Sequence, residues 1–224
     1  MNILEEIAGK TRERIEEEKR RCSPAEMKGL AEELLRSKKH GGAGALTGAD
    51  NAAAGGCFYR ALAVPGMSYI CEVKKASPSK GLIAPDFPYL EIAKEYEAAG
   101  ASAISCLTEP FYFRGADQYL KEITGSARIP VLRKDFTVDE YMIYQAKTLG
   151  ASAVLLICAI LDKVQLRDYR QLAESLGLDA LVEIGPGKAL SGFVKKTVPE
   201  LPVYAVETAA ELEQLTETLK GTSL

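Results

Sequence analysis

Short apolar runs alternate with helix-type patterns through most of the chain after residue 67. Each apolar run predicts a buried strand, and each following segment has the spacing of an amphipathic helix. Repeated strand–helix units place strands parallel to one another, so the pattern predicts either a (β/α)₈ barrel or a doubly wound sheet. The predicted strands cover residues 69–73, 103–107, 130–132, 153–157, 180–184 and 203–206, and the predicted helices cover residues 88–99, 117–124, 138–149, 162–176 and 208–219, with a weaker helical pattern at 188–196.

One tetrapeptide occurs twice in equivalent positions of this pattern. Gly-Ala-Ser-Ala stands at residues 100–103 and again at residues 150–153, each time after a predicted helix and before a predicted strand. Glycine ends a helix well because it adopts positive φ without strain, and the small residues let the next strand begin close to the helix. Equivalent turns in successive units are expected of a barrel.

The N-terminal part has a different pattern. Residues 2–39 predict two amphipathic helices, with Ser23 as the N-cap of the second and Pro24 at its first position. Residues 41–56 contain 12 Gly or Ala among 16 residues and predict a linker, because no dinucleotide or P-loop glycine pattern is present. We therefore divide the chain into a helical extension, residues 1–66, and a barrel domain, residues 67–224.

Charge and hydropathy narrow the classes of function. Twenty-eight basic and 31 acidic residues give a formal charge of −3, which predicts no binding of nucleic acid or of an anionic membrane. No segment reaches the roughly 18 consecutive apolar residues of a membrane span. The first residues lack the basic and apolar regions of a secretory signal. These features predict a cytoplasmic protein.

Cysteine and histidine are too few for several kinds of site. The five cysteines are an odd number without CxxC spacing, which predicts neither disulfides nor a zinc centre. His40 is the single histidine, so a Ser-His-Asp triad or a histidine metal site is not expected. Acid–base chemistry would therefore depend on Lys, Glu and Asp.

Charged side chains concentrate where predicted strands end. Glu72 and Lys74 alternate on one face, Lys134 follows the third strand, and Glu183 lies inside an apolar strand. Parallel α/β folds carry their sites at the carboxyl ends of strands, so these residues are expected to converge. A structural ion-pair cluster is the alternative interpretation.

The strand-end motifs resemble the indole-3-glycerol phosphate synthase family. The resemblance rests on Glu-Val-Lys-Lys-Ala-Ser-Pro-Ser-Lys-Gly at residues 72–81, Leu-Thr-Glu at 107–109, Pro-Val-Leu-Arg-Lys-Asp-Phe at 130–136, Val-Leu-Leu-Ile at 154–157 and Leu-Val-Glu at 181–183. It extends from the N-terminal helix to about residue 184, apart from the Gly/Ala linker. It implies a (β/α)₈ TIM-type barrel with an N-terminal helical extension.

The resemblance also implies an activity, a carboxy-lyase reaction in tryptophan biosynthesis. The family converts 1-(2-carboxyphenylamino)-1-deoxyribulose 5-phosphate into indole-3-glycerol phosphate, CO₂ and water, without a metal or an organic cofactor. By resemblance, Lys134 is the general acid, Glu183 the general base, Lys74 the partner of the substrate carboxylate, and Glu72 the residue that orients Lys74. The implied substrate-binding residues are Ser77, Ser105, Phe113, Phe136 and Leu156, and the implied phosphate-binding residues are Ser77, Gly221 and Thr222.

The chain departs from the family pattern from Gly185 onwards. The family's sixth-strand and seventh-strand patterns are absent, and the 160 residues from Pro65 to Leu224 fall short of the roughly 200 that eight units need. We therefore expect a barrel that is incomplete at its sixth to eighth units. Two alternatives stay open: an inactive remnant that binds a phosphate ligand or, through open sheet edges, a partner chain, and another phosphate-binding barrel such as phosphoribosylanthranilate isomerase. The expected assembly is a monomer or a homo-oligomer.

Overall fold

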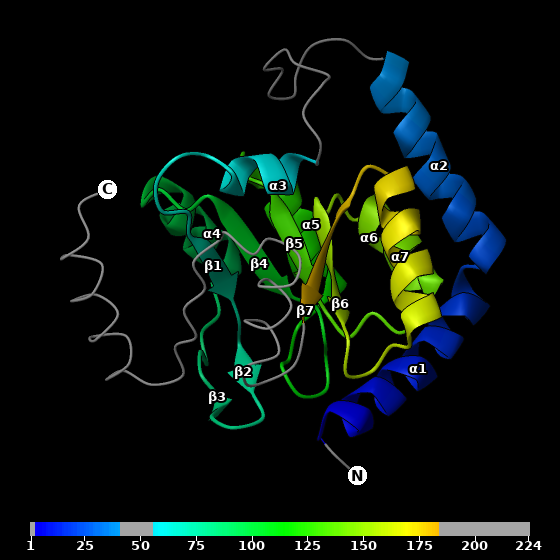
Figure 1. Ribbon diagram of the computed structural model, residues 1–224. Helices are drawn as coiled ribbons and strands as arrows, with labels where there is room; N and C mark the ends of the chain where they lie inside the picture. The colour runs from blue at the N-terminus through cyan, green and yellow to red at the C-terminus, as the bar shows by residue number, and fades with distance from the viewer. Residues whose placement is uncertain (1–2, 41–55, 184–224) are drawn as a thin grey trace, which may run out of the picture. The chain divides into compact units, whose positions relative to one another are not determined.

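A five-stranded parallel sheet forms the centre of the computed structural model, which describes residues 3–40 and 56–183 (Figure 1). The strand order is β1-β4-β5-β6-β7, without the reversal that a doubly wound sheet has at its switch point. The described part is therefore a partial (β/α) barrel. Its elements are α1 (Ile3–Arg21), α2 (Pro24–His40), α3 (Cys57–Leu62), β1 (Ile70–Val73), β2 (Ala76–Ser77), β3 (Gly81–Leu82), α4 (Tyr89–Ala98), β4 (Ala103–Leu107), α5 (Asp117–Ser126), β5 (Val131–Lys134), α6 (Glu140–Thr148), β6 (Ala153–Ile157), α7 (Lys163–Ser175) and β7 (Asp179–Glu183).

The central strands confirm the predictions made from apolar runs. β4 and β6 have the predicted bounds, and every residue of both is buried. β1, β5 and β7 differ from the predicted ranges by one or two residues at their ends. The predictions at 188–196, 203–206 and 208–219 lie outside the described residues.

The two Gly-Ala-Ser-Ala turns are equivalent in the structure, as predicted. Gly100 and Gly150 have φ angles of +90° and +83°, values that favour glycine. In each turn the following alanine amide donates a 3.0 Å hydrogen bond to a carbonyl five residues earlier. The turns thereby end α4 and α6 and lead the chain directly into β4 and β6.

The helical extension packs on the same body as the sheet. Ser23 caps α2 as predicted, because the amide of Glu26 donates to its Oγ at 3.3 Å and Glu26 accepts from the Ser23 amide at 2.7 Å. α2 packs along α6 through Met27 and Ala31, which are buried, whereas Leu30 is half exposed. The division at residue 66 stays an interpretation of the sequence.

The short helix α3 was not predicted. It lies at the end of the sheet opposite the β2–β3 hairpin (Figure 1), and its Phe58 side chain is fully buried. Asp179, the first residue of β7, accepts hydrogen bonds from the amides of Gly56, Phe58 and Tyr59 at 2.7 to 3.0 Å. α3 therefore closes the amino-terminal end of the strands and is fixed by a carboxylate of the sheet.

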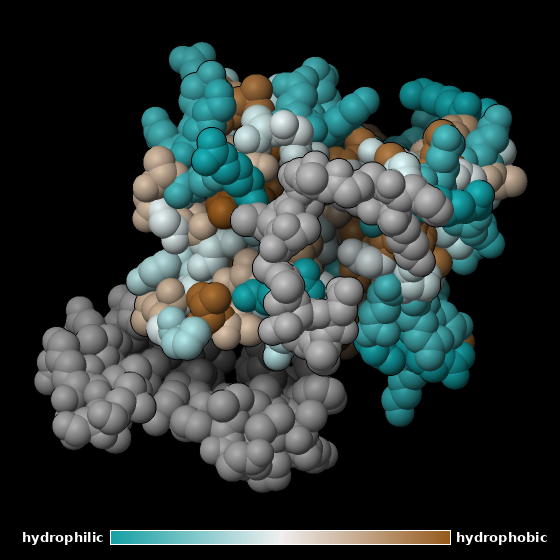
Figure 2. All heavy atoms as spheres, turned by 90° about the horizontal axis from the view of Figure 1, so that it is seen from above, coloured by the Kyte–Doolittle hydropathy of each residue, from teal (hydrophilic) through white to brown (hydrophobic). Residues whose placement is uncertain are grey.

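Seen from the side of α3, hydrophilic side chains project from the outer helices, and hydrophobic ones gather between them (Figure 2). Within residues 3–40 and 56–183, no helix has the length and apolar character that crossing a membrane requires.

Candidate active site

The carboxyl ends of β1 and β5 carry the predicted charged residues on one face of the sheet. Glu72 is level with Ser105 of the intervening strand β4, and Leu107 of β4 is level with Lys134. Because side chains alternate along a strand, Glu72, Lys74, Ser105 and Lys134 share this face. The strand topology therefore brings together residues that are up to 62 positions apart in the chain.

A single carboxylate lies between two ammonium groups. Oε1 of Glu72 is 2.5 Å from Nζ of Lys74, and its Oε2 is 3.7 Å from Nζ of Lys134. All three side chains are about one-third exposed, so they are shielded by the barrel but open to a ligand. Two cations against one anion leave a local excess of positive charge, which suits an anionic substrate.

Ser105 adds an unused polar atom to this face. Ser105 is 4 % exposed, and its Oγ has no hydrogen-bond partner in the described part of the chain. A buried hydroxyl without a partner is costly and is often explained by a ligand or by water. The structure thus places the predicted substrate-binding Ser105 beside the charged residues, on the strand between them.

Two of the predicted aromatic residues are neighbours. The ring centroids of Phe113 and Phe136 are 6.4 Å apart, with an angle of 38° between the ring planes. Phe113 belongs to the loop after β4, and Phe136 follows Lys134 by two residues. This aromatic pair therefore joins the loop after β4 to the segment that follows Lys134.

Ser77 lies in the β2–β3 hairpin that follows Lys74. Its Oγ accepts a hydrogen bond from the amide of Lys80 at 3.2 Å, which leaves the hydroxyl proton for another acceptor. The amide of Ala76 donates to the carbonyl of Phe113 at 3.2 Å, so the hairpin is joined to the loop that carries this aromatic ring.

Leu156 is not brought to the site. Arg133 is level with Val154 across β5 and β6, so Lys134 is level with Leu155. Leu156 is on the opposite face, where it is fully buried, and Leu155 is the leucine that shares the face of Lys134. An all-apolar strand gives no periodic signal for its faces, and only the register with β5 distinguishes the two leucines.

For three further predicted residues, Glu183, Gly221 and Thr222, the structure describes at most the backbone. Glu183 ends β7, and its backbone is level with Ile157 at the end of β6, but its side chain lies outside the described part. Gly221 and Thr222 also lie outside the described residues.

Glu109 shapes the site without having been predicted to do so. Its carboxylate is fully buried and accepts hydrogen bonds from the amides of Phe111, Tyr112 and Phe113 at 2.7 to 3.0 Å. It therefore fixes the loop that presents Phe113. A Glu two residues after an apolar strand, followed by a turn with many amide donors, was the available signal.

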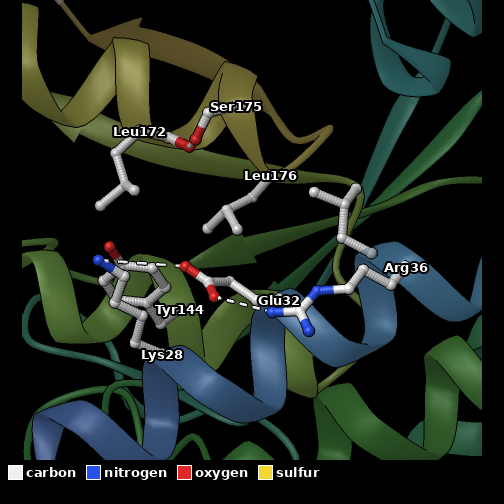
Figure 3. A pocket seen from close by; sticks show the side chains of 8 residues that line it. Lys28, Glu32, Arg36, Tyr144, Leu172, Ser175 and Leu176 are labelled. Atoms are coloured by element: carbon white, nitrogen blue, oxygen red, sulfur yellow. Dashed lines mark hydrogen bonds and ion pairs between the residues drawn. The ribbon is translucent and has the colours of Figure 1, made fainter.

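A hollow of about 470 Å³ lies elsewhere, among α2, α6 and α7 (Figure 3). Glu32 lies between Lys28 and Arg36, with N–O distances of 4.0 and 3.2 Å. The Lys28 and Arg36 side chains are 55 % and 72 % exposed, so these are surface ion pairs between successive turns of α2, without the shielding that the barrel gives to the charged groups at the strand ends.

A partial (β/α) barrel with an ammonium–carboxylate cluster at the carboxyl ends of its strands has the architecture of barrel enzymes. The family model for indole-3-glycerol phosphate synthase matches residues 4–197, and the chain belongs to this family. The match extends past residue 184, where the motif resemblance ended.

Curated relatives carry the same family name. The chain is 48 % identical over 181 residues to the indole-3-glycerol phosphate synthase of Ruminiclostridium cellulolyticum and 50 % identical over 181 residues to that of Lacticaseibacillus paracasei. Each match covers 81 % of this chain and 64 % of the relative. The matched part thus spans less than two thirds of these relatives.

Proposed function

We propose that this chain catalyses the indole-3-glycerol phosphate synthase reaction, acting as a carboxy-lyase. The substrate is 1-(2-carboxyphenylamino)-1-deoxyribulose 5-phosphate, and the products are indole-3-glycerol phosphate, CO₂ and water. The observation that carries the proposal is the Glu72 carboxylate between Lys74 and Lys134 at the strand ends. The names of the relatives support the assignment of this chemistry.

Ring closure requires an acid at the substrate ketone. In the proposed mechanism, Lys134 donates a proton to the ketone oxygen while the aromatic carbon attacks the carbonyl carbon. Lys74 binds the substrate carboxylate, and Glu72 holds both ammonium groups in position. Phe113 and Phe136 contact the aromatic ring of the substrate, with Ser105 as a hydrogen-bond partner.

Loss of CO₂ and of water completes the reaction. The carbon–carbon bond between the ring and the carboxylate breaks, which releases CO₂ and returns the electron pair of this bond to the ring system. The hydroxyl formed in ring closure then leaves as water. In this dehydration, Glu183 is proposed to remove a proton from the ring carbon next to the one that bears the hydroxyl, while an ammonium group of the Lys74–Lys134 pair protonates the leaving oxygen. Ser77, Gly221 and Thr222 are proposed to bind the phosphate, and the reaction needs no cofactor. We propose a cytoplasmic location for a protein of this function.

The direct test is to incubate the full chain with this substrate and to follow indole-3-glycerol phosphate by fluorescence and mass spectrometry. We expect turnover by the unchanged chain and by the Lys163→Ala control, whose substitution is on α7. A chain that binds the substrate without releasing product or CO₂ would instead support the remnant hypothesis.

The order of the proposed steps is testable at Glu183. The Glu183→Gln variant preserves the shape of the side chain but removes its ability to accept the proton. In single-turnover experiments we expect a cyclised intermediate to accumulate. Product formation at the unchanged rate, without that intermediate, would assign the base to another residue.

A further inference from the structure

One face of α1 contacts the two loops that carry the aromatic pair. The hydroxyl of Tyr112, in the loop after β4, donates to Glu6 at 2.5 Å, and Nζ of Lys10 lies 5.0 Å from the Tyr112 ring centroid. Arg14 reaches the segment after β5. Glu6, Lys10 and Arg14 are four residues apart, so they form one stripe along the helix.

The contact of Arg14 is a buried ion pair. Its Nη2 donates to Oδ2 of Asp135 at 2.9 Å, the Arg14 side chain is 12 % exposed and the Asp135 side chain is fully buried. Burial raises the pKa of Asp135, but Arg14 and Arg133 outweigh this effect and hold the pKa below its usual range. Asp135 is therefore negatively charged in the neutral pH range, and its ion pair with Arg14 fixes the position of its carboxylate.

Asp135 in turn fixes the segment between Lys134 and Phe136. Its Oδ1 accepts from the amide of Phe136 at 2.8 Å, and its Oδ2 accepts from Oγ1 of Thr108 at 2.6 Å. Thr108 also accepts from Nε of Arg133 at 3.2 Å. The Asp135 carboxylate thus links the Phe136 amide to Arg14 of α1 and to Thr108, the residue after β4. The amide of Thr108 in turn donates to the carbonyl of Lys134 at 3.0 Å.

We propose that Arg14 and Asp135 are positioning residues, through which α1 sets the placement of Lys134 and Phe136 at the candidate active site. The contact of α1 with Tyr112 acts in the same direction, since Tyr112 precedes Phe113. The inference rests on the proposed function where it concerns catalysis, but the placement itself is a property of the chain without substrate.

The test uses the full chain with Arg14→Met. This substitution removes the positive charge that pairs with Asp135 and retains a side chain of similar length. Arg12→Met is the matched control, because Arg12 is an exposed arginine on the same helix. Arg14→Lys is the conservative variant that retains a cation. All measurements are made where circular dichroism shows each variant to be folded.

Two readouts need no substrate. Hydrogen exchange of the Phe136 amide is expected to accelerate about tenfold or more in Arg14→Met, and exchange in β6 is expected to stay unchanged. Acetylation of Lys134 by acetic anhydride is expected to become faster relative to acetylation of Lys163. Arg12→Met is expected to match the unchanged chain in both measurements, and Arg14→Lys to restore part of the protection.

With substrate, kcat/KM of Arg14→Met is expected to fall about 10- to 100-fold, with a decrease in kcat as well as any rise in KM. A lower melting temperature with unchanged exchange at Phe136 and unchanged labelling of Lys134 would overturn the inference. If the unchanged chain does not turn over substrate, the proposed function fails, and the two substrate-free readouts still decide the positioning role.

Discussion

Nζ of Lys134 lies 3.7 Å from Oε2 of Glu72, although β4 separates the strands that carry these residues. The contact crosses a neighbouring strand because both side chains extend from the same face at the carboxyl edge of the sheet. The same carboxylate also contacts Lys74. Removal of one member of this group therefore changes the environment of the other two.

Lys134→Ala is expected to lower kcat by about 10²- to 10⁴-fold, because it removes the proposed proton donor to the ketone. The fold is expected to remain, since the side chain is 35 % exposed and takes no part in the core. Steady-state kinetics and circular dichroism measure the two properties. Unchanged turnover would remove Lys134 from the proposed mechanism.

Asp135→Asn is expected to reduce the free energy of unfolding at pH 7 by about 3 to 5 kcal/mol, because Arg14 and Arg133 lose the charge that compensates them. The pKa of Asp135 is lowered in the folded state, so its stabilisation is present above the unfolded pKa of about 4 and is lost as the pH falls through the folded pKa. Urea unfolding measured from pH 7 downwards should show the difference between variant and unchanged chain shrinking below pH 4. A constant difference would contradict this linkage.

Phe58→Ala is expected to cost about 3 to 5 kcal/mol, since the ring is fully buried at the amino-terminal end of the strands. Tyr59→Ala is the control, because the neighbouring Tyr59 side chain is 56 % exposed. Equilibrium denaturation measures both variants. Equal stability of the two would show that α3 does not close the core in solution.

Cys106 is expected to resist alkylation in the folded protein. It is fully buried, and burial raises the pKa of its thiol to about 12, so the thiolate is scarce at neutral pH. Cys57 is exposed and should react with iodoacetamide first. Peptide mass spectrometry after timed labelling distinguishes the two. Modification of Cys106 at the rate of Cys57 without denaturant would contradict the buried position.

The strands that are buried along their whole length could be predicted from the sequence. β4 and β6 are apolar on both faces and begin after a glycine turn, so their bounds were readable. α3 and the β2–β3 hairpin are too short for a periodic pattern, and both are fixed by contacts distant in sequence, such as Asp179 with the Phe58 amide.

The candidate site could be predicted where the alternation of side chains along a strand shows which residues share one face of the sheet. Glu72 and Lys74 are two residues apart and do share a face, and their convergence with Lys134 followed from parallel strands. The sequence could not show that Leu155 rather than Leu156 shares the face of Lys134, because no polar residue marks the faces of β6. The positioning pair was missed because Arg14 and Asp135 are 121 residues apart and each resembles an ordinary surface charge.

The attachment of α3 to Asp179 bears on the order in which the chain acquires structure. The Gly56 amide and its acceptor are 123 residues apart, so this bond closes a loop that contains β1 to β6. During synthesis, the helices and strands of that loop leave the ribosome before Asp179 does, and they make their local contacts first. The bonds from Asp179 to the amides of Gly56, Phe58 and Tyr59 can form only after β7 has emerged. We therefore expect the final attachment of α3 to be a late folding event, which a ribosome-stalled chain ending before residue 179 would lack.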